Sequence, residues 1–100
     1  MEIVLQYFDG CPGWRLAEER LRVALTAAGT DATVTQVEVA TLAEAERVGF
    51  TGSPTLLIDG RDRFGDTGAA PSLACRRYMT EAGVEPSPSV EQLLAAIRDG

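Results

Sequence analysis

The sequence predicts an α/β protein of one domain, residues 1–100, with a mixed four-stranded sheet, helices on both faces and the order βαβαββα. Three observations predict this fold class. Apolar, β-branched segments alternate with segments of helical periodicity, which is typical of α/β proteins. The strand–helix–strand start implies parallel pairing with a crossover helix. The dipeptide Asp59-Gly60, between two short strand-like segments, is a hairpin signal that adds an antiparallel strand.

Local signals set the ends of the predicted elements. Pro12 suits the first turn of a helix, and Gly29 stands where a helix C-cap is expected. Thr41 and Ser89 each begin a capping-box pattern that opens a helix. The predicted strands are residues 2–8, 32–39, 55–58 and 61–64, and the predicted helices are residues 12–28, 41–48, a short one at 72–82, and one from Ser89 that carries Val90, Leu93, Leu94 and Ile97.

Composition excludes several classes of function. The chain has 15 acidic against 9 basic residues and no basic run, which argues against nucleic acid and anionic membranes as partners. It has no histidine, which excludes serine–histidine triads, cysteine–histidine dyads and histidine-ligated metal sites. The longest apolar run is far too short for a membrane span, and residues 1–5 lack the basic start of a signal peptide. We therefore expect a cytoplasmic protein.

The two cysteines, Cys11 and Cys75, are the main candidates for chemistry. In a reducing compartment, two cysteines are more often buried thiols, reactive thiols or soft-metal ligands than a structural bridge. Cys11 lies at a strand–helix junction, where the positive end of the helix dipole stabilises a thiolate. The nearby carboxylate of Asp9 opposes that effect. Two interpretations of Cys75 stay open. It is a buried thiol on the short helix, or it is a partner for Cys11.

The motif Cys11-Pro12-Gly13-Trp14 at a helix start, followed about 40 residues later by Ser53-Pro54 before an apolar strand, resembles the thioredoxin-like fold family. The resemblance covers nearly the whole chain. It implies that Cys11 matches the first active-site cysteine and that Pro54 matches the cis-proline facing it. Trp14 stands where the family's C-x-x-C motif has its second cysteine. Cys11 therefore has no partner thiol within its own motif.

This resemblance implies thiol–disulfide or glutathione-linked redox activity, with no cofactor required beyond glutathione itself. The substrate would be a protein or small-molecule thiol or disulfide. Pro12, Trp14, Ser53 and Pro54 are the expected substrate-binding residues, with main-chain bonds at Ser53-Pro54 holding an extended peptide or glutathione. Trp14 also fits the apolar stripe of its helix, which favours core packing.

The resolving step has two alternatives. Cys75 resolves the mixed disulfide in a distal-dithiol mechanism, or an external thiol resolves it in a monothiol mechanism. Glutaredoxin-like members of the family bind glutathione with the segment that corresponds to residues 65–68 here. The Gly65–Pro71 loop is expected to lead back to Cys75 on the same side as Cys11.

Two other functions stay open. Two thiolates converging on one pocket, with Asp9 nearby, suit a soft metal ion or an organomercurial, although no other metal site is predicted. Alternatively, the chain is a redox-inactive binding module that has lost the second cysteine of its motif. Tight, stoichiometric metal binding that needs both cysteines would indicate the first function. Ordinary thiol reactivity of Cys11, with no effect of its replacement by serine, would indicate the second.

Overall fold

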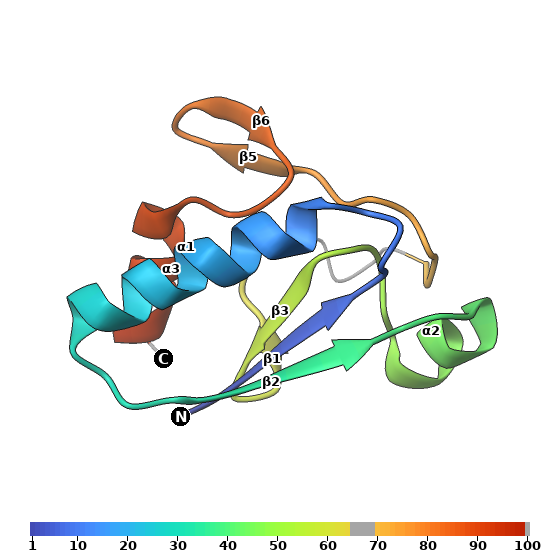
Figure 1. Cartoon of the computed structure of the whole chain (residues 1–100), viewed down its shortest axis with the longest axis horizontal. Coiled ribbons are helices and arrows are strands. Elements are labelled where there is room, and N and C mark those ends of the chain that lie inside the picture. The colour runs from blue at the N-terminus through green and yellow to red at the C-terminus, as the bar shows by residue number, and fades with distance from the viewer. Residues whose placement is uncertain (65–69, 100) are drawn as a thin grey trace.

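The computed structural model describes residues 1–64 and 70–99 and contains a mixed four-stranded sheet, which lies along one side of the molecule (Figure 1). The strand order is β2 (Thr33–Glu38), β1 (Glu2–Tyr7), β3 (Thr55–Ile58) and β4 (Arg61–Asp62). β1 pairs in parallel with β2, β3 runs antiparallel to β1, and β4 runs antiparallel to β3. The predicted mixed sheet is confirmed, although β4 is shorter than the predicted 61–64.

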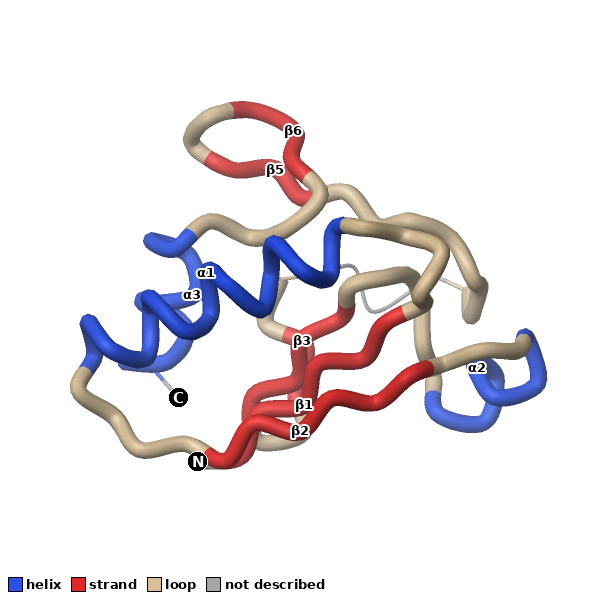
Figure 2. The backbone as a smooth tube through the Cα atoms, viewed as in Figure 1, coloured by secondary structure: helices blue, strands red, loops and turns tan. Residues whose placement is uncertain are grey.

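Helices α1 (Gly13–Ala28) and α3 (Val90–Asp99) pack on each other over one face of the sheet (Figure 2). The inward side chains of β1 and β3 share one parity, because Ile3 lies opposite Ile58 and Leu5 lies opposite Leu56. The main core consists of these strand residues together with Trp14, Ala17, Leu21, Ala24, Leu93, Ala96 and Ile97.

Helix α2 (Leu42–Val48) does not cover the opposite face, so the expectation of helices on both faces is corrected. Its one buried residue, Ala45, packs with Val39 and Phe50 in a second cluster beyond the end of β2. A seven-residue helix that follows β2 this closely reaches the end of the sheet and not its middle.

The capping boxes are confirmed at both helices. The Thr41 hydroxyl accepts a hydrogen bond from the Glu44 N–H (3.1 Å). At α3 the exchange is reciprocal, because Gln92 N–H donates to the Ser89 hydroxyl (3.1 Å) and Ser89 N–H donates to the Gln92 side chain (3.0 Å). Local sequence alone therefore determines where these helices begin.

The predicted helix at residues 72–82 is wrong. Residues 70–77 run without regular structure, and β5 (Tyr78–Thr80) then pairs with β6 (Gly83–Glu85) in a separate antiparallel hairpin. Tyr78 and Thr80 are buried while Met79 between them is 70% exposed, which is the alternation of a strand. We call residues 70–89 the arm; Figure 1 shows it passing the start of α1 before it returns to α3.

Within the described residues, no helix has the length and the apolar character that crossing a bilayer requires.

Candidate functional site

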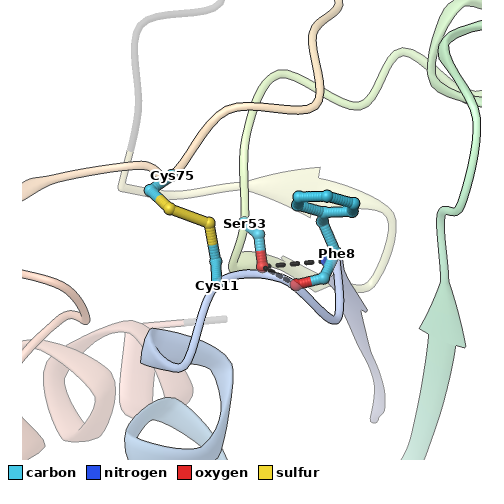
Figure 3. The surroundings of a disulfide bond; sticks show 4 residues. All are labelled: Phe8, Cys11, Ser53 and Cys75. Carbon is cyan, nitrogen blue, oxygen red and sulfur yellow. Dashed lines mark hydrogen bonds between the residues drawn. A yellow bond between two sulfur atoms is a disulfide. The ribbon is translucent and has the colours of Figure 1, made fainter.

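Cys11 and Cys75 form a disulfide in the structure, with their Cα atoms 5.7 Å apart (Figure 3). The two residues are 64 positions apart in the sequence, so the fold brings together the two predicted site cysteines. The reading of Cys75 as a buried thiol on a helix is wrong, because Cys75 is exposed and lies in an extended part of the arm.

The Cys11 side of the bridge is built by the turn between β1 and α1. Cys11 N–H donates to the Phe8 carbonyl (3.0 Å), and Pro12 then sits at the N-cap of α1. Cys11 is only 3% exposed. Its sulfur therefore belongs to a buried residue at the positive end of a 16-residue helix.

The Cys75 side is held by main-chain pairing with Ser53. Ser53 N–H donates to the Ala74 carbonyl (2.9 Å), and Arg76 N–H donates to the Ser53 carbonyl (2.8 Å). These two bonds make a parallel bridge between Ser53 and Cys75. The Ser53 main-chain groups expected to hold a substrate peptide are thus taken by the chain's own arm.

Ser53 also fixes the Cys11 side through its hydroxyl. This hydroxyl accepts a hydrogen bond from Phe8 N–H (2.9 Å) and donates to the Phe8 carbonyl (3.4 Å), as Figure 3 shows. The Ser53–Pro54 peptide bond is cis, as the resemblance implied. One fully buried serine therefore positions both halves of the disulfide, with its side chain on one and its backbone on the other.

Arg76 anchors the arm directly after Cys75. Its guanidinium donates to Asp62 (2.7 Å and 3.3 Å) and to the Thr55 hydroxyl (3.3 Å), and it lies 4.6 Å from the centre of the Tyr78 ring. The Tyr78 hydroxyl donates in turn to the Pro54 carbonyl. Burial raises the pKa of Tyr78, and the neighbouring Arg76 opposes that shift without cancelling it.

Two glycines permit the close approach of the arm. A Cβ at Gly13 would meet the Pro86 carbonyl oxygen at 2.9 Å, and a Cβ at Gly52 would meet Arg76 Cβ at 3.0 Å. Gly52 also has φ +144°, a conformation that side chains of L-residues rarely adopt. The glycine of the Cys11-Pro12-Gly13-Trp14 motif thus serves the contact between α1 and the returning arm.

A cavity of about 300 Å³ opens beside the disulfide. It is lined by both cysteines, by Ser53 and Arg76, and by the apolar residues Pro12, Leu16 and Pro86 with Gly13. Four of the six predicted site residues border it, since Cys11, Pro12, Ser53 and Cys75 are among its lining.

The other two predicted site residues, Trp14 and Pro54, are buried and do not border this cavity. Trp14 is part of the main core and stacks on Tyr7 with ring centres 4.2 Å apart, while the Arg15 guanidinium covers its ring. The core-packing reading of Trp14 is therefore confirmed.

Sequence reasoning missed Asp62, Tyr78 and Pro86 as parts of the site. Only 18% of the Asp62 side chain is exposed in the ion pair with Arg76. Contacts between such distant positions leave no local periodicity, so no signal in the sequence could have found them.

The geometry does not test the predicted glutathione-binding segment or the predicted capture of a soft metal ion. The segment 65–68, likened to the glutathione-binding part of glutaredoxins, lies outside the described residues. Within the described ranges no group of three or more histidine, cysteine or acidic side chains is placed to hold a metal ion. The two cysteines lie close enough to form the disulfide, so their reduced thiols would offer a cation two sulfur donors.

Scans of protein-family models, of curated proteins and of solved structures find no match for this chain.

Proposed function

We propose that this chain is a thiol–disulfide exchange protein of thioredoxin-like fold that uses Cys11 and Cys75 as a distal dithiol. The observation that carries the proposal is a disulfide between a cysteine at a helix N-terminus and an exposed cysteine of the arm, beside a cavity. A purely structural bridge needs neither an exposed cysteine nor a cavity at its sulfurs. The cis-proline next to Ser53 and the Cys11-Pro12 helix start support the thioredoxin-like assignment.

In this function the bridge alternates between disulfide and dithiol. Reduction adds two electrons and two protons to the Cys11–Cys75 pair, and a partner pair of thiols becomes a disulfide. Cys75 takes the place of the cysteine that the motif lacks at Trp14. Glutathione is the expected small-molecule partner, because it carries one thiol and is the common reductant of cells.

The test is equilibration of the protein with glutathione buffers of graded ratio, followed by alkylation and mass measurement. We expect the bridge to open at a potential between about −120 and −270 mV, the range of exchange proteins. Turnover of oxidised glutathione or another small disulfide should be lost in both Cys11→Ser and Cys75→Ser. A bridge that stays closed below about −300 mV would indicate a structural disulfide. The exchange function would then be excluded, and the redox-inactive binding module would remain as the hypothesis. Retained turnover in Cys75→Ser would indicate the monothiol mechanism.

A second candidate is capture of a soft two-coordinate cation by the reduced pair. It is favoured by the closeness of the two cysteines, together with the absence of a third ligand among the described residues. Such a donor set suits Hg(II) or Cu(I) and no hard cation. Titration of the reduced protein with each ion, with Cys75→Ser as the control, separates this function from exchange, because only capture gives tight one-to-one binding that needs both thiols.

A further inference from the structure

The two sulfurs of the disulfide belong to residues of very different exposure. Cys11 is 3% exposed, enclosed by the end of β1, the start of α1 and the Ser53 loop. Cys75 is exposed on the arm, between exposed Ala74 and half-buried Arg76. Figure 3 shows Cys75 on the arm side of the bridge and Cys11 against α1.

This asymmetry decides which sulfur an outside thiol reaches. Exchange proceeds by attack of a thiolate on one sulfur along the line of the S–S bond, with the other sulfur as leaving group. Attack on Cys11 would need an open path from behind Cys11, where the residue is buried. Attack on Cys75 needs a path only from the exposed side of the arm.

We propose that Cys75 is the sulfur that partner thiols and disulfides meet, and that Cys11 is the leaving and resolving group. This inference rests on the proposed exchange function and reverses the order expected from the motif, in which Cys11 attacks first. It assigns the entry role to the arm cysteine and an internal role to the helix cysteine.

Each exchange step forms one bond to sulfur and breaks another. A partner thiolate RS⁻ attacks Cys75 Sγ, the Cys11–Cys75 bond breaks, and its electron pair leaves on Cys11 Sγ. A second RS⁻ attacks the partner sulfur of RS–S–Cys75, which releases RSSR and the Cys75 thiolate. In the opposite direction Cys75 thiolate attacks RSSR and expels RS⁻. Cys11 thiolate then attacks Cys75 Sγ and expels the second RS⁻.

The helix position of Cys11 suits a leaving group. A thiol of lower pKa leaves faster, and a thiolate at a helix N-terminus is stabilised by the N–H groups of the first turn and by the macrodipole. The dipole of α1 therefore serves the departure of Cys11, and the exposure of Cys75 serves the arrival of the partner.

The same site limits what the partner is. The Ser53 main-chain groups that an extended peptide would need are occupied by Ala74 and Arg76. The free space is the 300 Å³ cavity, which has apolar walls at Leu16 and Pro86. A small thiol, or one or two side chains of a partner, fits this volume, so glutathione is a suitable probe.

The first experiment uses the oxidised wild-type protein. It is mixed with glutathione, quenched in acid after short times, and its free thiols are alkylated. Cleavage after arginine places the two cysteines on separate peptides, residues 1–15 and 64–76. We expect glutathione on Cys75 and the alkyl group on Cys11. Glutathione on Cys11 would overturn the assignment while leaving the exchange function intact. No adduct on either peptide, with the bridge still closed, would overturn both.

The second experiment compares the single thiols. Cys75 in Cys11→Ser should react with oxidised glutathione about tenfold faster than Cys11 in Cys75→Ser, and the two rates should converge in concentrated guanidinium chloride. A faster Cys11 in the folded variants would count against the proposal. Where loss of the bridge frees the arm and equalises the rates, the wild-type peptide map decides between the two assignments.

Discussion

The body of the molecule and its arm are held together by different forces. In the body, β1, β3, α1 and α3 bury apolar side chains that are at most 8% exposed. The arm packs some apolar groups on the body, among them Leu73 and Tyr78, and is held in addition by the disulfide, the main-chain pairing with Ser53, and the Arg76–Asp62 ion pair at 2.7 Å. Strand β6 adds a further ion pair, between Glu85 and Arg20 of α1, at 3.0 Å.

This difference implies that the two regions respond differently to change. Apolar burial is lost only when the body unfolds, whereas separate polar contacts break one at a time and allow local opening. The arm is therefore the part of the molecule that a change of redox state should affect most.

Loss of the disulfide should have the largest effect. Cys75→Ser should lower the free energy of unfolding by about 4 kcal/mol, because a bridge across 64 positions restricts the unfolded chain strongly. Urea unfolding of oxidised wild type and of the variant measures it, with Cys11→Ser as the matched control that should lose a similar amount. Amide exchange should quicken first in residues 70–89. Equal quickening in β1 would contradict the separation of body and arm.

Truncation of one core residue of the body should come next. Leu56→Ala removes a fully buried side chain between the sheet and the helices, at a cost of about 3 kcal/mol. The neighbouring Leu57→Ala is the control, because Leu57 is half-buried on the other face and should cost about 1 kcal/mol. Chemical unfolding of both variants measures the contrast. Equal losses would mean that the open face of the sheet is covered after all.

Removal of the arm's cationic anchor should have a smaller and more local effect. Arg76→Ala breaks the contacts with Asp62, Thr55 and the Tyr78 ring, which should cost about 1 to 2 kcal/mol. Arg77→Ala, at an exposed adjacent position, should change stability little. Hydrogen exchange of the arm in each variant is the readout. An Arg77 effect as large as that of Arg76 would show that net charge, and not the anchor, holds the arm.

The smallest effect concerns acid pH. The hydrogen bonds from Arg20 and Thr80 lower the pKa of Glu85 in the folded protein. The folded pKa lies below the unfolded value, so this stabilisation is present above the unfolded pKa and is lost as pH falls through the folded one. Glu85→Gln should therefore flatten the acid side of a plot of melting temperature against pH. The exposed Glu46→Gln should leave the curve unchanged, and a flattening there would refute the assignment to Glu85.

The elements up to the hairpin at Asp59-Gly60, and the start of α3, were predictable because their signals are local. Apolar periodicity indicated β1, α1 and β3, and the capping boxes at Thr41 and Ser89 marked the starts of α2 and α3. The placement of α2 was not predictable, because local signals do not determine which side of a sheet a short helix occupies.

The arm was not predictable for the same reason. Residues 72–82 carry apolar residues at a spacing that also suits a helix, but their structure is set by distant partners: Ser53, Asp62 and Pro54. Within the site, Cys11 and the cis Ser53–Pro54 bond followed from a motif. The exposure of Cys75 follows from tertiary contacts, which the spacing of residues in the sequence does not predict.

The stacking of Trp14 on Tyr7 has a practical consequence for anyone who studies this molecule. Trp14 is the sole tryptophan of the chain and lies three residues after Cys11, in the first turn of α1. Indole fluorescence depends on the immediate surroundings of the ring, and here it comes from a single position beside the site. The protein thus contains its own optical probe of that helix end, which requires no label and no added chromophore.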